Sequence, residues 1–449
     1  MISVSGIRGR VGFGLTPEVF ARYAAAFGAW AIAKGPSRAV VLGRDSRVSG
    51  PLFHQVARAA LESVGADVVD LGITTTPTLQ LAVEHHHAAG GLGITASHNP
   101  IEWNALKFIG SDGLFLSAAD GLAMRALIDD IPYATWDKLG VTRFDGDAVA
   151  RHLDAVLALP MIHIDAIRAR KFRVAYDACR GAGGIVIPRL LDLLGCEVQA
   201  IELEPDGRFP RPPEPVPANL GPLCTLVKET GADIGFATDP DVDRLALVDN
   251  LGVAIGEDYT LALAARVVLK HRQGPVVTNL STSLVVDDQA AEAGVQVLRA
   301  PVGEVNVAMA MRAAKAVIGG EGNGGVILPE LHLGRDAPLG VALLLQMLVD
   351  AGEPLSAVVA RYPRYVIIKD KLDRPAAPLD AVYVALRAAF PEATADTQDG
   401  LRLGWPDRWV HVRPSGTEPI VRVIAEGPTV EAARALVDRG RALLAQLAR

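Results

Sequence analysis

The sequence predicts three related mixed α/β domains followed by a distinct α+β domain at the C-terminus. The chain has 449 residues, whereas a single domain usually has about 100–200. A strand–loop–helix–glycine–strand unit occurs three times, and after residue 364 the pattern changes to short strands and a closing helix. Half of the residues are hydrophobic and 21% are charged, so the chain has enough apolar material for several cores.

The repeated unit joins two strands through a polar loop, a helix and a glycine. Glycine suits the left-handed residue that ends many helices, and the whole unit is a crossover between parallel strands. Three copies indicate three related domains, although such units could also arise in any α/β protein. The strand, helix and second strand are expected at 38–43, 51–64 and 66–71, at 172–176, 187–194 and 196–201, and at 275–279, 284–293 and 295–298, with Gly65, Gly195 and Gly294 after the helices.

Domain boundaries are expected where polar segments separate these units. The polar run 137–147 precedes a helix, and segment 250–255 follows a strand. The proline-rich stretch 205–222 is interpreted as a surface loop of the second domain, since strand and helix patterns resume behind it. The expected domains are residues 1–148, 149–252, 253–363 and 364–449.

Composition argues against several classes of protein. The formal charge of −7 is unfavourable for a general nucleic-acid or acidic-membrane surface. The longest apolar runs, 24–33 and 339–349, are too short to span a bilayer, and the N-terminus lacks a signal-peptide core. Three widely spaced cysteines favour neither a disulfide framework nor a thiolate metal site. We therefore expect a cytoplasmic protein without a nucleic-acid or membrane partner, either a monomer or a homodimer.

The first loop of interest is Thr-Ala-Ser-His-Asn-Pro (95–100), which follows a short apolar, glycine-rich strand. Asn99 precedes a proline and so favours extended conformations. The Ser97 hydroxyl is a weak nucleophile unless a neighbour activates it or it already carries a group to transfer. Taken alone, the motif favours an ordinary turn, and the other loops of the chain reverse that preference.

A second loop, Asp-Pro-Asp-Val-Asp-Arg (239–244), lies between two expected strands. Alternation along an extended loop would place Asp239, Asp241 and Asp243 on one side. Like charges at such distances are costly unless a cation neutralises them, and all-oxygen ligation suits a hard ion such as Mg²⁺. The alternative is an acidic surface turn.

Two further loops favour a phosphorylated, hydroxyl-rich ligand. The segment 413–419 offers a guanidinium, two hydroxyls and glycine amides to a tetrahedral dianion, with Arg422 as a second cation. The glycine-rich segment 319–325 leaves Glu321 and Asn323 as its only side chains able to bond a ligand such as a sugar. A flexible hinge is the alternative for this second segment.

Together, these motifs resemble the α-D-phosphohexomutase superfamily, which interconverts sugar 1- and 6-phosphates. The resemblance covers the whole chain in order: Gly-Ile-Arg-Gly (6–9), the serine loop with Lys107, the aspartate loop, Gly-Glu-Gly-Asn-Gly-Gly (320–325) and Arg-Pro-Ser-Gly-Thr-Glu-Pro (413–419). It implies four domains around a central cleft, a phosphosugar substrate, one Mg²⁺ per active site and a sugar 1,6-bisphosphate as activator.

The resemblance also implies roles for individual residues. Ser97 is the phosphorylated residue and a metal ligand together with Asp239, Asp241 and Asp243. Arg8, His98 and Lys107 act at the transferring phosphoryl group. The implied substrate-binding residues are Arg244, Glu321 and Asn323, and, at the non-reacting phosphate, Arg413, Ser415, Gly416, Thr417 and Arg422.

The sugar loop departs from the bacterial glucosamine and mannose/glucose mutases, which usually carry a serine and a closing histidine. Asn323 and Gly325 hold these places here, as in archaeal-type members. His332 is expected to replace the missing imidazole. We expect a phosphoglucosamine mutase, with glucose and mannose phosphates as alternative substrates. A phosphoserine-type phosphatase and a non-catalytic phosphosugar-binding protein are further alternatives.

Overall fold

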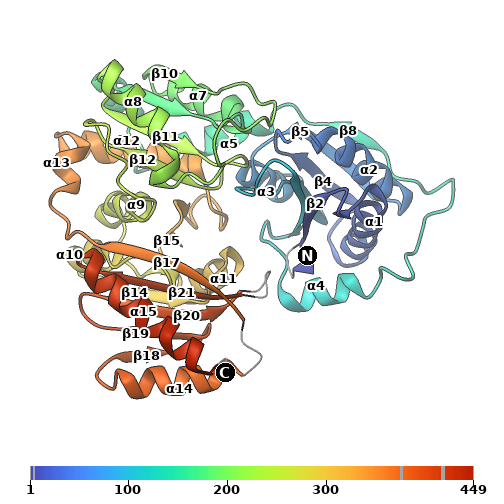
Figure 1. Ribbon diagram of the computed structural model, residues 1–449. Helices are drawn as coiled ribbons and strands as arrows, with labels where there is room; N and C mark the ends of the chain where they lie inside the picture. The colour runs from blue at the N-terminus through green and yellow to red at the C-terminus, as the bar shows by residue number, and fades with distance from the viewer. Residues whose placement is uncertain (1, 4–5, 375–377, 416–419, 448–449) are drawn as a thin grey trace.

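The computed structural model describes residues 2–3, 6–374, 378–415 and 420–447 (Figure 1). Four β-sheets follow one another along this part of the chain, and helices pack against them. The first three sheets are mixed, and the fourth is antiparallel. None of the described helices has the length and apolar character needed to cross a membrane.

The first sheet has the strand order β1-β2-β7-β6-β4-β5-β8, with β3 paired to β2. Side chains alternate across β4, so Val40 and Leu42 pack under α1 and α2 while Val41 packs under α3. Thr16 caps the N-terminus of α1, directly before a proline that suits the first helical position. The elements are β1 (Ile2–Ser3), β2 (Gly6–Val11), β3 (Gly14–Leu15), α1 (Pro17–Lys34), β4 (Ala39–Arg44), α2 (Gly50–Ser63), β5 (Asp67–Ile73), α3 (Thr76–His85), β6 (Gly90–Ile94), β7 (Trp103–Gly110), α4 (Ala118–Arg125) and β8 (Thr142–Phe144).

The second and third sheets have the orders β10-β9-β11-β12 and β14-β13-β15-β16. Their apolar side chains merge with those of α9 and α12 into one continuous core. The elements of the second unit are α5 (Ala148–Leu157), α6 (Ile164–Arg170), β9 (Arg173–Asp177), α7 (Gly183–Leu193), β10 (Glu197–Ile201), the 3₁₀ turn η1 (Pro217–Asn219), α8 (Gly221–Thr230), β11 (Ile234–Thr238) and β12 (Leu245–Val248). Those of the third are α9 (Asp258–His271), β13 (Val276–Asn279), α10 (Val285–Glu292), β14 (Val297–Ala300), α11 (Glu304–Ala314), β15 (Ile318–Glu321), β16 (Gly325–Ile327), α12 (Ala337–Ala351) and α13 (Leu355–Val359).

The predicted repeat is confirmed by strand topology. The orders β5-β4-β6-β7, β10-β9-β11-β12 and β14-β13-β15-β16 are equivalent, with two parallel pairings followed by one antiparallel pairing each time. The three helix-ending glycines, Gly65, Gly195 and Gly294, all have positive φ angles, of 84°, 69° and 69°. Boundaries differ most at two elements: α7 begins at Gly183 rather than near residue 187, and β14 spans Val297–Ala300 rather than 295–298. A Cβ at Gly183 would lie 2.2 Å from the Tyr176 hydroxyl, so this glycine serves close packing rather than a turn.

The fourth sheet has the order β17-β21-β20-β19-β18 and is covered by two helices. It contacts the third unit where Trp409 packs against Leu284, and Figure 1 shows it beside α10 and β14. The domain boundaries at 148, 252 and 363 stay predictions. The elements are β17 (Val366–Asp373), α14 (Leu379–Ala389), β18 (Thr394–Asp396), β19 (Leu401–Gly404), β20 (Trp409–Pro414), β21 (Ile420–Gly427) and α15 (Val430–Leu447).

The repeat gives the three polar loops equivalent positions. The serine loop joins β6 to β7, the aspartate loop joins β11 to β12, and the glycine-rich loop joins β15 to β16. Each loop leaves the carboxyl end of a strand that has a parallel neighbour and enters the next strand, which runs antiparallel to it. Ligands of open α/β sheets bind at the carboxyl ends of strands, so the fold favours these loops as one composite site.

Candidate active site

Ser97 is buried against the aspartate loop. Its Oγ donates a 2.7 Å hydrogen bond to Asp239 Oδ2, and its backbone N–H donates to Thr95 Oγ1 over 2.9 Å. The φ angle of Ser97 is +47°, in the left-handed region that few residues other than glycine occupy. Such backbone strain persists only where surrounding contacts enforce it.

Arg47 supplies those contacts from the loop after β4. Its side chain is fully buried and paired with Asp45, whose Oδ2 lies 3.1 Å from Arg47 Nε. The guanidinium also donates to three backbone carbonyls of the serine loop, those of Ser97 (2.5 Å), Asn99 (2.7 Å) and Pro100 (2.8 Å), and to the carbonyl of Trp103 (2.9 Å) at the start of β7. The polar loop after β4 therefore serves as a scaffold for Ser97.

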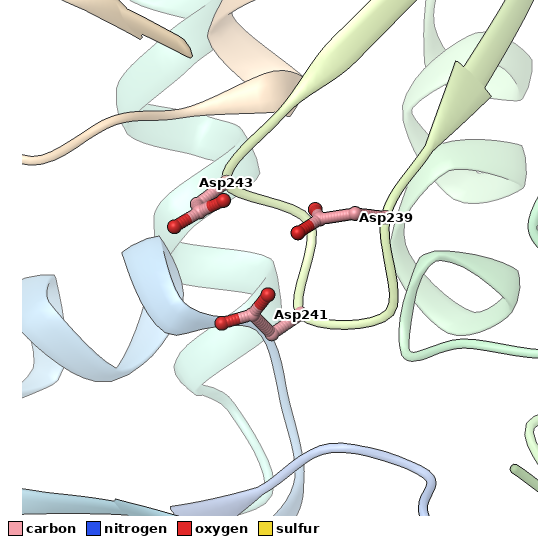
Figure 2. Close-up of side chains that lie close together, drawn as sticks. All are labelled: Asp239, Asp241 and Asp243. Carbon is pink, nitrogen blue, oxygen red and sulfur yellow. The ribbon is translucent and has the colours of Figure 1, made fainter. Parts of the chain in front are cut away.

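The three aspartates converge as predicted, with one carboxylate oxygen from each lying within 4.8 Å of the others (Figure 2). All three are buried. Their convergence does not come from alternation along an extended loop, because the chain folds back on itself here. Val242 has a φ angle of +64°, and its N–H donates to the Asp239 carbonyl over 3.2 Å.

The aspartate loop fits a hard divalent cation. Asp241 Oδ1 and Asp243 Oδ1 are buried and accept no hydrogen bond from any described residue. Burial and the neighbouring Asp243 and Asp241 charges raise the pKa of Asp239 well above its ordinary value. Three converging carboxylates with unsatisfied oxygens are the donor set that Mg²⁺ prefers.

Lys107 approaches the aspartates from β7. Its Nζ lies 2.6 Å from Asp241 Oδ2 and 3.7 Å from Asp243 Oδ2, and Thr76 Oγ1 donates to Asp241 Oδ2 over 2.6 Å. Burial alone would lower the pKa of Lys107, but Asp241 and Asp243 raise it above its ordinary value. Lys107 is therefore held as a cation beside the aspartates.

Arg8, His98 and Arg244 line the same pocket as Ser97. Arg8 Nη1 donates to Asn99 Oδ1 over 2.8 Å, and His98 Nδ1 lies 3.3 Å from Ser97 Oγ. The positive charge of Arg244, followed by burial, holds the pKa of His98 well below its ordinary value. The imidazole is therefore neutral near pH 7.

These side chains line one pocket formed by the first three units. Its charged and polar lining consists of Arg8, Ser97, His98, Lys107, Arg244, Glu304 and Arg335. Five of these were predicted from sequence. A pocket with several cations around one hydroxyl can bind a phosphorylated ligand and stabilise phosphoryl transfer.

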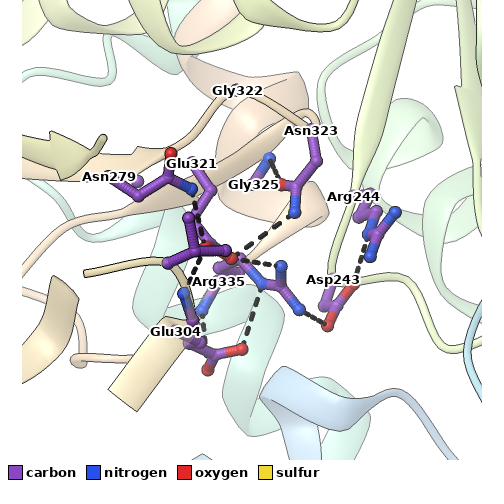
Figure 3. Close-up of polar contacts among 12 residues, drawn as sticks. Asp243, Arg244, Asn279, Glu304, Glu321, Gly322, Asn323, Gly325 and Arg335 are labelled. Carbon is purple, nitrogen blue, oxygen red and sulfur yellow. Dashed lines mark hydrogen bonds and ion pairs between the residues drawn. The ribbon is translucent and has the colours of Figure 1, made fainter. Parts of the chain in front are cut away.

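Glu321 and Asn323 adjoin this pocket in a dense hydrogen-bond network (Figure 3). Glu321 Oε1 accepts from Asn279 Nδ2 (2.8 Å) and Gly303 N (3.0 Å), while Oε2 lies 2.6 Å from Arg335 Nη1. Burial alone would raise the pKa of Glu321. The positive charge of Arg335, helped by the hydrogen bonds from Asn279 and Gly303, outweighs burial and lowers this pKa below its ordinary value. Glu321 is an anion already held by protein donors.

His332 does not line this pocket, and the expectation that it replaces the sugar-loop imidazole stays a prediction. Its side chain is buried, Nε2 lies 2.9 Å from Asp336 Oδ2, and Nδ1 accepts from Gly334 N over 3.1 Å. Asp336 also contacts His152 Nε2 at 2.8 Å. Both ring nitrogens of His332 are thus engaged in packing the third unit against α5.

Two of the residues predicted to bind the second phosphate, Arg413 and Arg422, lie on the fourth sheet and do not line the pocket around Ser97. Arg413 Nε donates to Asp399 Oδ2 over 2.7 Å, and Arg413 pairs in register with Arg422 across β20 and β21. Ser415 N donates to the Ile420 carbonyl over 2.9 Å. Gly416 and Thr417 lie outside the described residues.

Sequence reasoning missed Arg47, Glu304 and Arg335. Each is buried, and no local motif marks its role. Arg335 stands three residues after His332, in a segment that the sequence analysis associated with the sugar loop. One signal was available in the sequence. Two adjacent ionisable residues, Arg335 and Asp336, stand directly before the apolar helix α12, where buried charged groups need partners.

Comparison with known proteins defines the class. Four models described as phosphoglucomutase/phosphomannomutase match in order: α/β/α domain I at residues 2–133, domain II at 150–252, domain III at 256–365 and the C-terminal domain at 368–443. The chain belongs to the phosphoglucomutase/phosphomannomutase family, and the resemblance to the α-D-phosphohexomutases is confirmed. It is a mutase, an isomerase of the phosphohexomutase type.

Among individual proteins, the chain is similar to two archaeal relatives. It is 38% identical to the "Probable phosphoglucosamine mutase" of Methanopyrus kandleri, over 97% of this chain and 95% of the relative. It is 37% identical to the "Phosphoglucomutase/phosphomannomutase" of Thermococcus kodakarensis, over 98% and 97%. A phosphoglucomutase/phosphomannomutase family protein from Burkholderia thailandensis has the same fold, with a TM-score of 0.85, 27% identity and coverage of 100% and 98%.

Proposed function

We propose that this mutase interconverts the 1- and 6-phosphates of a hexose, with glucosamine phosphate as the preferred substrate. The observation that carries the proposal is the 2.7 Å contact between Ser97 Oγ and Asp239, inside a pocket lined by Arg8, Lys107 and Arg244. The preference for glucosamine is supported by the Methanopyrus kandleri relative and its printed name. Glucose and mannose phosphates are the alternatives, supported by the Thermococcus kodakarensis relative.

In the proposed reaction, Ser97 carries a phosphoryl group at rest. A free sugar hydroxyl attacks the phosphorus, the P–Oγ bond breaks as the new P–O bond forms, and the proton lost by the sugar balances the one gained by Ser97. Asp239, Asp241, Asp243 and the phosphoserine would hold one Mg²⁺, which would neutralise charge on the phosphoryl oxygens. Lys107 and Arg8 stabilise the same charge from the protein side.

The bisphosphorylated sugar must then turn end for end and return its other phosphate to Ser97. We propose that Glu321 and Asn323 hold sugar hydroxyls in both orientations, while Arg413, Ser415, Gly416, Thr417 and Arg422 anchor the phosphate that is not reacting. A sugar 1,6-bisphosphate would prime Ser97. We propose that the enzyme works in the cytoplasm, as a monomer or a homodimer.

A substrate panel tests this function. Purified enzyme with Mg²⁺ and a little glucose 1,6-bisphosphate is given the 1-phosphates of glucosamine, glucose and mannose, and formation of each 6-phosphate is followed. The fastest isomerisation is expected with glucosamine 1-phosphate. Steady release of inorganic phosphate without isomerisation would favour a phosphatase, and absence of turnover on all three sugars would favour a binding protein.

A further inference from the structure

Arg335 connects three carboxylates that belong to different parts of the site. Its buried guanidinium lies 2.6 Å from Asp243 Oδ2 through Nη2, 2.6 Å from Glu321 Oε2 through Nη1, and 3.0 Å from Glu304 Oε2 through Nε (Figure 3). Asp243 lies in the aspartate loop, Glu321 ends β15, and Glu304 begins α11. The two terminal nitrogens donate hydrogen bonds to Glu321 and Asp243, whereas Glu304 is an ion-pair partner that accepts no hydrogen bond from Nε. The planar guanidinium suits a fork between Asp243 and Glu321, because its donors point in fixed, separate directions.

Gly325 makes room for this side chain. A Cβ on Gly325 would lie 2.2 Å from Arg335 Cδ and 2.9 Å from Arg335 Cγ. Gly325 is not among the described residues with a positive φ angle, so its backbone conformation does not itself require glycine. The side chain of Arg335 can therefore occupy this position only because residue 325 has no side chain.

We propose that Arg335 is a positioning residue that ties the aspartate loop to the sugar loop, and that Gly325 is required to admit it. The proposal rests on the proposed function, in which Asp243 holds the metal and Glu321 the sugar. Arg335 occupies Asp243 Oδ2 and leaves Oδ1 for a cation. It also offsets three buried negative charges that would otherwise repel one another.

The first test removes the guanidinium. In Arg335→Met, kcat/KM for the sugar phosphate should fall by about 10–100-fold, because the two loops lose their common partner. Binding of Mg²⁺ alone, measured by calorimetry without sugar, should nevertheless tighten by at least about 10-fold, since a positive charge in contact with a metal ligand is gone. Tighter metal binding with slower turnover is not expected from a residue that only stabilises the fold.

Arg335→Lys keeps the charge and serves if the methionine variant fails to fold. A lysine reaches Asp243 or Glu321 but cannot fork between them. Its affinity for Mg²⁺ should stay within about 3-fold of the parent, while its kcat/KM falls as in the methionine variant. The control is Arg312→Met, which removes an exposed ion pair with Asp112 from the same unit and should change neither quantity.

The second test is a double-mutant cycle between positions 325 and 335. Gly325→Ala should displace Arg335 and lower kcat/KM by about 10-fold, whereas adding the same alanine to Arg335→Ala should cost less than about 2-fold. Multiplicative losses, or an unchanged Mg²⁺ affinity in folded Arg335→Met, would overturn the inference. If the parent enzyme turns over none of the sugars, the proposed function fails, and the magnesium titration still decides the role of Arg335.

Discussion

Ser97 Oγ and Asp239 Oδ2 lie 2.7 Å apart, although 142 residues separate them along the chain. A second contact joins the same two units, because Thr76 donates its N–H to the Asp241 carbonyl (2.9 Å) and its hydroxyl to Asp241 Oδ2 (2.6 Å). The Ser97 hydroxyl of the first unit is thus docked on the acidic loop of the second. Phosphoryl transfer depends mainly on such positioning.

The first prediction concerns the covalent intermediate. Ser97→Ala should lower kcat by more than about 10³-fold, because no hydroxyl remains to carry the phosphoryl group. Intact-mass spectrometry should show a phosphorylated fraction in the parent protein and none in the variant. Ser117→Ala, at the N-cap of α4, is the control and should keep both activity and phosphate. Phosphate retained in the Ser97 variant would place the modification elsewhere.

The second prediction concerns metal binding. Thr76→Val keeps the shape of the side chain but removes the hydroxyl that donates to Asp241. Outer partners of metal ligands typically contribute 10–100-fold in affinity, so Mg²⁺ binding should weaken by about 10-fold. Calorimetric titration with MgCl₂ measures it. Thr230→Val is the matched control, because it removes only a hydrogen bond to the Leu226 carbonyl. Equal affinities for Mg²⁺ in the two variants would contradict the proposed metal site.

The repeat could be predicted because it depends on local sequence patterns, whereas the convergence of the aspartates was predicted from an alternation that the loop does not follow. A strand, a helix and a glycine with positive φ are properties of short segments, and three copies of one topology place equivalent loops at equivalent sheet edges. Val242 shows the limit of that reasoning. The left-handed backbone of Val242 produces the convergence of the aspartates that alternation was expected to give. Valine rarely adopts this conformation, so the sequence does not predict it.

Arg335 and Arg47 could not be predicted, for a different reason. Each acts through a buried guanidinium whose partners are distant in sequence: Arg335 and Asp243 are 92 residues apart, and Arg47 and Ser97 are 50 apart. An isolated arginine in a sequence is more often a solvated surface residue. The buried ion pair of His332 with Asp336 could likewise not be predicted from the sequence pattern.

The third prediction is a pH dependence of stability centred on Asp258. Burial raises the pKa of Asp258 to about 7, with Lys369 acting in the opposite direction. Because the folded pKa lies above the unfolded one, the folded protein binds the extra proton and its stability falls as pH rises from about 4 to 7. Asp258→Asn should therefore stabilise the protein at pH 8, by on the order of 2 kcal/mol, and have little effect near pH 4.

Urea unfolding of the parent and the Asp258→Asn variant at both pH values measures this difference. Asparagine can still accept the 2.9 Å hydrogen bond from Ser283 N, so the local structure is kept. A variant that is equally stable relative to its parent at pH 4 and pH 8 would show that Asp258 titrates normally in the folded protein.

The last prediction concerns the attachment of the fourth sheet to the third unit. Glu426 is fully buried, and its Oε2 accepts from Trp409 Nε1 (2.6 Å) and Leu284 N (2.9 Å), while Ser283 Oγ donates to Oε1. Burial raises the pKa of Glu426, and these three donors oppose the rise. Glu426→Ala leaves the donors unpaired in the interface and should cost about 2–4 kcal/mol.

Glu426 and Trp409 belong to the fourth sheet, whereas Ser283 and Leu284 belong to the third unit. The loss of stability in Glu426→Ala should therefore mainly weaken the contact between the fourth sheet and the third unit. Hydrogen exchange should therefore accelerate first in β20 and β21, and calorimetry should resolve an early transition that the parent lacks. The KM for sugar phosphate should rise with little change in affinity for Mg²⁺, since the proposed phosphate anchor moves with the sheet and the aspartates do not. Uniform acceleration of exchange in all four sheets, with a single transition, would instead mean that the chain unfolds as one cooperative body.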